Sequence, residues 1–140
     1  MKVAIVAAKF NAFIVDKLVD GATATLREHG LGEGDIFVAH VPGAFELPAV
    51  ARRLADAGGW DAIICVGCVI RGATSHYDLV SGHAAYGVGK VAMKSKVPVI
   101  FGVLTVENVE QALERIGHGA SYAQAALEMA TLYRQLDAHA

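Results

Sequence analysis

The chain has 140 residues, a length typical of one domain, and the sequence predicts a single domain over residues 1–140. Hydrophobic residues make up 54% of the chain and charged residues only 19%, which predicts strands buried on both faces and some surface covered by other subunits. The net charge of −2 argues against a nucleic-acid partner, and no apolar run approaches the ~20 residues that a membrane span needs. Only two cysteines occur, which argues against a disulfide scaffold. We therefore expect a cytoplasmic protein.

Apolar runs of strand length alternate with segments of helical periodicity along the whole chain. The predicted strands are residues 2–8, 35–41, 61–70 and 98–105, and the predicted helices are residues 14–30, 46–58, 77–95, 108–116 and 120–136. The first helix illustrates the pattern, because Ile14, Leu18, Ala22 and Leu26 recur every four residues and Gly30 is a candidate C-cap.

The order of these elements predicts the fold class. Apolar strands that are each followed by a helix favour parallel pairing with helices on both faces. Right-handed crossovers then give a three-layer, flavodoxin-like α/β fold with a four-stranded parallel sheet. Ligands of such sheets bind outside the carboxyl ends of the strands, which directs attention to the loops at 9–11, 42–46, 71–76 and 105–108.

The loop at 71–76 has the features of a phosphate site. Gly72 and Ala73 allow close approach of a ligand to the backbone, Thr74 and Ser75 add hydroxyl groups, and a predicted helix begins immediately afterwards. The free N–H groups and the dipole of a helix start favour an anion. The alternative is structural, since Ser75 and Asp78 have the spacing of a capping box on an ordinary helix.

His76 is a candidate for proton transfer. It falls in the first turn of the predicted helix, where the positive end of the helix disfavours a protonated imidazole. A neutral base beside a phosphate site suits elimination of phosphate from a carbon skeleton. The alternative is a histidine that only caps the helix or lies on the surface.

Aromatic residues follow two of the predicted strands. Phe10 and Asn11 come after the first strand, and Phe45 and Glu46 come after the second. Together they could hold a flat heterocycle by stacking and by accepting its N–H groups. The alternative makes the two aromatics core lids, Asn11 a turn residue and Glu46 a helix cap. Phe101, inside the fourth strand, has the pattern of a core residue.

The two cysteines form a C-x-x-C pattern that does not predict redox chemistry. Cys65 and Cys68 lie inside a predicted buried strand, and their odd spacing directs them to opposite faces. His76 and His83 could share a helix face, yet no further Cys, His or carboxylate follows at ligand spacing. We therefore expect neither a redox pair nor a metal site.

Six segments resemble the lumazine synthase family in order and spacing, and the likeness covers essentially the whole chain. These segments are residues 9–11 (KFN), 41–48 (VPGAFELP), 67–78 (GCVIRGATSHYD), 101–105 (FGVLT), 110–115 (EQALER) and 125–129 (AALEM).

The resemblance implies an enzyme, a transferase of riboflavin biosynthesis. Its family condenses 5-amino-6-(D-ribitylamino)uracil with 3,4-dihydroxy-2-butanone 4-phosphate to give 6,7-dimethyl-8-ribityllumazine, phosphate and water, with no metal or organic cofactor. Carried onto this chain, the resemblance makes His76 the proton-transfer residue. The ribitylaminouracil would contact Phe10, Ala44, Phe45, Glu46, Cys68, Val69, Ile70 and, from a neighbouring subunit, Phe101. The phosphate would contact Gly72, Ala73, Thr74 and Arg115.

Two positions depart from the family pattern. Lys9 stands where the family commonly has Arg, and a short loop puts His118 where many members have a lysine. Whether His118 replaces that lysine at the phosphate is left open by the sequence.

The resemblance also implies an assembly. The family forms pentamers with active sites between subunits, and in many members pentamers join into icosahedral shells; we expect a pentamer and leave the shell open. Riboflavin synthase is a candidate partner. The alternatives to the enzyme are a flavin- or ribityl-binding module that has lost catalysis and a shell-forming structural protein on the same fold.

Overall fold

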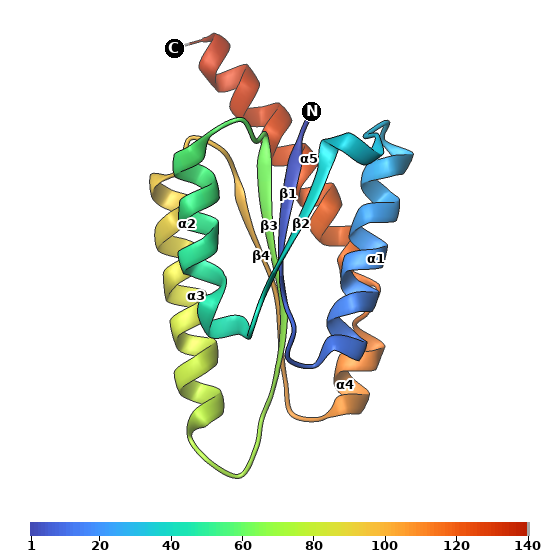
Figure 1. The fold of residues 1–140 in the computed structure, drawn as a ribbon, viewed down its shortest axis with the longest axis vertical. Coiled ribbons are helices and arrows are strands. Elements are labelled where there is room, and N and C mark those ends of the chain that lie inside the picture. Colours follow the sequence, from blue (N-terminus) through green and yellow to red (C-terminus); the bar gives the residue numbers. More distant parts are fainter. Residues whose placement is uncertain (140) are drawn as a thin grey trace.

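The computed structural model describes residues 1–139 as three layers, with a parallel sheet between two layers of helices (Figure 1). The strands are β1 (Val3–Ala8), β2 (Ile36–Val41), β3 (Ala62–Ile70) and β4 (Val99–Val106). The helices are α1 (Ala12–Glu28), α2 (Leu47–Ala57), α3 (His76–Lys94), α4 (Val109–Glu114) and α5 (His118–Ala138), with two 3₁₀ turns, η1 (Glu33–Asp35) and η2 (Ala44–Glu46).

The sheet has the strand order β2-β1-β3-β4, and every pair of neighbours is parallel. In the centre, Ile5 of β1 is level with Val38 of β2 and with Ile64 of β3. This arrangement confirms the predicted flavodoxin-like α/β fold with helices on both faces. It also brings the carboxyl ends of β1, β2 and β3 to one end of the molecule, while both termini lie at the other end (Figure 1).

Each face of the sheet has its own hydrophobic core. The predicted stripe of α1, from Ile14 to Leu26, is fully buried against one face, together with side chains of α4 and α5. The opposite face packs against α2 and α3, which contribute Leu47 and Val88. Successive residues of β3 alternate between the two cores, so this central strand is apolar on both sides.

The differences between predicted and observed elements lie at their ends and in short turns. Helix α5 begins at His118 rather than at residue 120. The two 3₁₀ turns were not predicted, because single turns have no hydrophobic period and depend on side-chain capping. In η1, a carboxylate oxygen of Asp35 accepts a hydrogen bond from the backbone N–H of Gly32 at 2.8 Å. None of the helices in residues 1–139 is both long and apolar enough to cross a membrane.

Candidate active site

A cavity of about 530 Å³ opens at the carboxyl ends of β1 and β3, on the side of the sheet covered by α2 and α3. Its walls come from the β1–α1 loop, the loop and turn after β2, the end of β3 and the first turns of α3. The lining residues are Phe10, Asn11, Pro42, Gly43, Ala44, Phe45, Glu46, Cys68, Val69, Ile70, His76, Leu79 and Val80.

This cavity gathers most of the residues predicted to hold the heterocycle, together with His76. The sheet order explains the meeting, because β1 lies between β2 and β3 and all three strands end at the same edge. Leu79 and Val80 were missed by the sequence analysis. They follow His76 by three and four residues on one helix face, which was the available signal.

The two aromatic residues of the cavity are not lids of the core. Phe10 is 71% exposed and Phe45 is 49% exposed, so the alternative interpretation of both as core residues is wrong. The Phe45 ring stacks on the imidazole of His83, with the ring centres 3.9 Å apart and the planes at 18°. The cavity therefore presents aromatic surface to a ligand.

Asn11 fixes the loop after β1 to the end of β3. Its backbone is left-handed, with φ of 60°, and its side-chain amide donates a hydrogen bond to the carbonyl oxygen of Cys68 at 2.8 Å. Left-handed backbone is uncommon outside glycine and is tolerated best by Asn and Asp. Asn11 is thus the predicted turn residue, and it also joins two walls of the cavity.

Glu46 caps a different element from the one expected. One of its carboxylate oxygens accepts a hydrogen bond from the backbone N–H of Gly43 at 2.9 Å. This contact closes η2, the turn before α2, rather than capping α2 itself. The carboxylate is half-buried in the cavity wall and retains further lone pairs for a ligand.

His76 is the first residue of α3, is exposed and lines the cavity. The backbone N–H of His76 donates to the hydroxyl oxygen of Thr74 at 3.3 Å. Ser75 is the N-cap residue, yet its side chain makes no capping hydrogen bond within the described chain, so the capping-box alternative is wrong. The loop before α3 is therefore organised by Thr74 rather than by a capping pair.

Arg71 ties this loop to its neighbours. Its guanidinium lies 3.0 Å from a carboxylate oxygen of Glu107, 3.6 Å from Asp78 and 4.3 Å from the centre of the Tyr77 ring. The hydrogen bond to Glu107, with the charges of both carboxylates, raises the pKa of Arg71 above its ordinary value. The end of β3, the start of α3 and the β4–α4 loop are joined through this one side chain.

The remaining predicted site residues do not line the cavity of this chain. Gly72, Ala73 and Thr74 are exposed in the loop directly before His76. Phe101 lies in β4 and is 39% exposed, so its pattern-based interpretation as a core residue is wrong.

Arg115 and His118 lie beyond α4, on the face of the sheet opposite the cavity. The guanidinium of Arg115 donates to the carbonyl oxygen of Gln111 at 2.8 Å. His118 is exposed and meets the Tyr122 ring edge-on, with the ring centres 6.3 Å apart.

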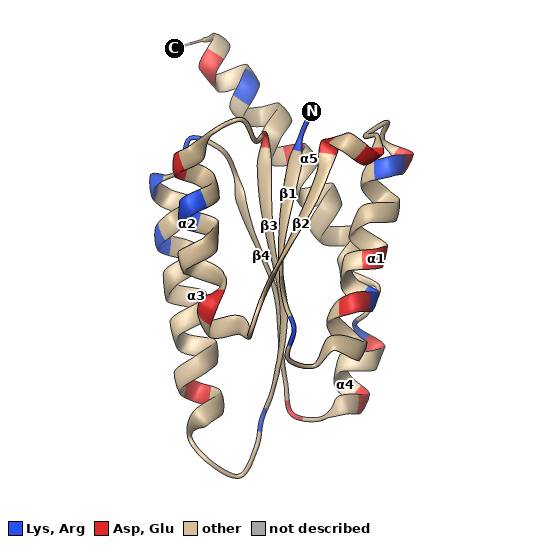
Figure 2. Cartoon of the chain, viewed as in Figure 1, with Lys and Arg blue, Asp and Glu red and all other residues tan. Residues whose placement is uncertain are grey.

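The charges around the cavity are unevenly distributed. Within residues 1–139, no Lys or Arg lines it, and Glu46 is its one carboxylate. Figure 2 shows the Lys and Arg positions of α2 and α3, coloured blue, toward the end of these helices that lies away from the carboxyl ends of the strands. They are Arg52, Arg53, Lys90 and Lys94. The lining of the cavity therefore offers no cationic side chain to a bound anion.

The two cysteines are buried and point to opposite cores, as predicted. Cys65 packs on the side of α2 and α3, and Cys68 packs on the side of α1 and α5. Burial raises the pKa of the Cys65 thiol to about 12 and that of Cys68 to about 11. Both are therefore thiols near neutral pH, and neither is an activated nucleophile. No group of three metal-ligand side chains occurs within residues 1–139.

An apolar cavity with aromatic walls, one carboxylate, backbone polar groups and an imidazole at its mouth suits a flat, nitrogen-rich ring and a proton transfer. The family model of 6,7-dimethyl-8-ribityllumazine synthase matches residues 1–134 of the chain. Because the match spans the sheet, the cavity and nearly all of α5, the chain belongs to the lumazine synthase family, whose members are transferases of riboflavin biosynthesis.

Proposed function

We propose that the protein condenses 5-amino-6-(D-ribitylamino)uracil with 3,4-dihydroxy-2-butanone 4-phosphate, releasing 6,7-dimethyl-8-ribityllumazine, phosphate and water. The observation that carries the proposal is the cavity in which Phe10, Phe45, Glu46 and the end of β3 meet His76. Such a site can bind a pyrimidine ring and place the imidazole of His76 next to both substrates. Holding two reactants together supplies much of the rate of a condensation.

The pyrimidine is held by the walls that come from the β1–α1 loop, the η2 turn and the end of β3. Phe10 stacks on the ring, and Ala44, Phe45 and Glu46 hold its edge and the ribityl chain. The backbone of Cys68, Val69 and Ile70 supplies further polar groups. The Cys68 carbonyl already accepts a hydrogen bond from Asn11, and it has a second lone pair for the substrate.

The phosphate of the second substrate binds the loop at Gly72, Ala73 and Thr74. This loop leads directly into the 19-residue helix α3, whose first N–H groups and dipole favour an anion. In this position the phosphate is adjacent to His76. The imidazole then moves protons as the imine forms and as phosphate is eliminated, and ring closure completes the product.

The site is completed by a neighbouring subunit. Phe101 is exposed on β4, and Arg115 lies on the opposite face of the sheet from the cavity of its own chain. We propose that both residues serve the cavity of the next subunit in a pentamer, where Arg115 supplies the cation that the cavity lining lacks. His118, exposed near Arg115, is a second candidate for the phosphate. On the same family likeness we propose a cytoplasmic location and riboflavin synthase as a candidate partner.

The test mixes purified protein with both substrates and follows the fluorescence of the lumazine and the release of phosphate. Turnover well above the spontaneous rate is expected. His76→Ala should lower kcat on the order of ten- to a hundred-fold, since general acid–base catalysis contributes at least this much. Arg115→Ala should raise KM for the phosphate substrate about ten- to a hundred-fold, the usual cost of losing a charged hydrogen bond.

His29→Ala is the matched control, because His29 is an exposed histidine at the far end of α1 and should leave both constants unchanged. If the wild-type protein bound the lumazine without turnover, the enzyme hypothesis would be wrong and the ribityl-binding module would take its place. A large particle without turnover or binding would favour the structural shell protein.

A further inference from the structure

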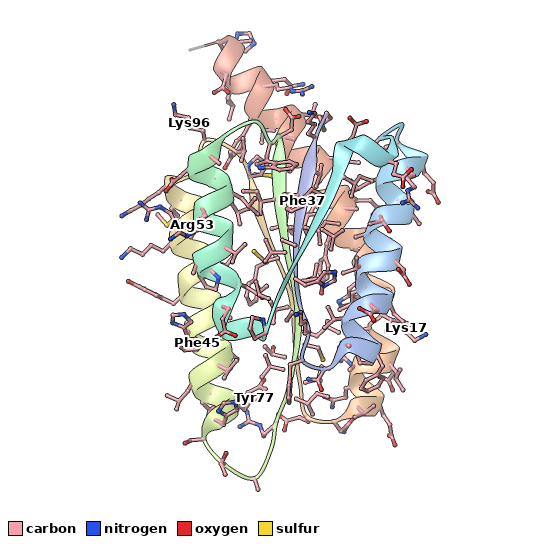
Figure 3. The ribbon with its side chains drawn as sticks, in the orientation of Figure 1. Lys17, Phe37, Phe45, Arg53, Tyr77 and Lys96 are labelled. Atoms are coloured by element: carbon pink, nitrogen blue, oxygen red, sulfur yellow. The ribbon has the colours of Figure 1, made fainter. Side chains whose placement is uncertain are left out.

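His83 lies on α3 two turns after His76 and stacks on the ring of Phe45, a residue of the cavity wall. Its imidazole faces the Phe45 ring at 3.9 Å between ring centres and 18° between planes. Phe45 lines the cavity and His83 does not. Figure 3 shows Phe45 at the η2 turn beside α3, the helix that carries His83.

The Phe45 ring lies on a short, half-exposed turn, where a stacking partner restricts its orientation. It belongs to a single 3₁₀ turn that is closed by the hydrogen bond between Gly43 and Glu46, and half of its surface is exposed. An exposed phenyl ring on a short turn can adopt several rotamers. A second flat ring at stacking distance favours one of them.

We propose that His83 is a positioning residue that holds the Phe45 ring as the wall against which the ribitylaminouracil is placed. The inference rests on the proposed function and adds a residue to it. His83 acts through Phe45, so it affects the binding of the planar substrate and takes no part in proton transfer. The phosphate substrate, bound at the loop before His76, does not depend on it.

Steady-state kinetics with each substrate varied in turn test this role. His83→Ala should raise KM for the ribitylaminouracil about five- to ten-fold, the size of effect expected from one aromatic pair. Both kcat and KM for the butanone phosphate should stay within about two-fold of wild type. His83→Phe restores a flat ring without the imidazole nitrogens and should restore the KM. The matched control is Tyr86→Ala, since Tyr86 is an exposed aromatic residue three positions further along α3. This variant should leave kcat and the KM of each substrate unchanged.

A double-mutant cycle separates a positioning role from an independent one. In a Phe45→Ala background, His83→Ala should add no further loss, because the ring that it supports is gone. Additive losses, an unchanged KM in His83→Ala, or a failure of His83→Phe to restore the KM would each overturn the inference. A fall in kcat as large as the rise in KM, together with a lower denaturation midpoint, would also overturn the inference. That result would indicate a general loss of folding.

Binding of 6,7-dimethyl-8-ribityllumazine, followed by its fluorescence, gives a readout that needs no turnover. His83→Ala should weaken this binding by no more than Phe45→Ala does, and His83→Phe should restore it. If wild-type protein binds the lumazine without catalysis, the proposed function fails while the binding series still tests His83. If wild-type protein turns over and the His83→Ala titration matches it, the positioning role alone fails.

Discussion

Asp61, at the start of β3, joins three distant parts of the chain. One carboxylate oxygen accepts a hydrogen bond from the backbone N–H of Lys2 at 2.7 Å, and the other accepts one from the guanidinium of Arg134 at 2.8 Å. Partial burial opposes ionisation, but the hydrogen bonds from Lys2 and Arg134 outweigh it and hold the pKa of Asp61 below its ordinary value. The folded protein therefore favours the ionised carboxylate.

Asp61→Asn should lower the free energy of unfolding near neutral pH. It should also remove the pH dependence that this carboxylate gives to the stability. Because the folded pKa is depressed, the stabilisation is present above the unfolded pKa and is lost as the pH falls through the folded pKa. We expect a loss of about 1 kcal/mol or less at about pH 7, since the pair is partly solvated, and a smaller difference at about pH 3. Urea unfolding of both proteins at the two pH values measures it. Asp56→Asn, in an exposed pair with Arg52, is the control, and a difference independent of pH would contradict the explanation.

The cysteine side chains give a second prediction at this scale. Burial raises the pKa of both thiols to about 11 or above, and the thiolate is the reactive form. Iodoacetamide at about pH 8 should therefore label neither Cys65 nor Cys68 in the folded protein and should label both in denaturant. Mass spectrometry of the alkylated chain counts the labels. Rapid labelling of the native protein would show that the β3 strand opens.

At the scale of the elements, Gly119 of α5 packs tightly against the backbone of α1. A side chain there would run into the carbonyl oxygen of Leu18, which is backbone and cannot rotate away. Gly119→Ala should lower the free energy of unfolding by about 1–3 kcal/mol, the usual cost of overpacking a buried contact. Gly117→Ala is the matched control, because a Cβ at Gly117 meets nothing within 4 Å. Equal stability of the two variants in urea would refute the close contact.

Strands and long helices were predictable because their signals are local. The stripe from Ile14 to Leu26 recurs with the helical period, and α1 buries it. The end of α1 and the two 3₁₀ turns were harder, since their positions depend on single capping contacts. The hydrogen bond from Gly43 to Glu46 is an example: it has no period that a sequence window could detect.

At the scale of the whole molecule, the sheet separates the parts of the proposed site. The cavity opens on the side of α2 and α3, whereas Arg115 follows α4 on the other side. In the folded chain Arg115 donates to the carbonyl oxygen of Gln111 and does not line the cavity. This separation supports the proposal that Arg115 serves the cavity of a second copy of the chain.

Mixed assemblies test this proposal directly. His76→Ala and Arg115→Ala each remove one of the two side chains that the proposed site combines. Co-expression of the two variants should yield mixed assemblies that are more active than assemblies of either variant alone. Random mixing leaves about one site in four with both wild-type side chains if these come from different chains. The assay is lumazine formation by the purified mixed assembly, with a mixture of the two separately assembled variants as control. No gain over the parents would mean that one chain supplies both residues.

The sequence alone determined which segments are strands and which are helices, the parallel three-layer arrangement, and the loops at which a site would form. It did so because periodicity and apolar runs are properties of neighbouring residues. Only the tertiary structure decided the contacts between distant residues: Asn11 with Cys68, Phe45 with His83, and Asp61 with Lys2 and Arg134. It also separated Arg115 from the cavity of its own chain. These relations depend on strand order and on which face each helix covers, and neither is encoded in any single stretch of sequence.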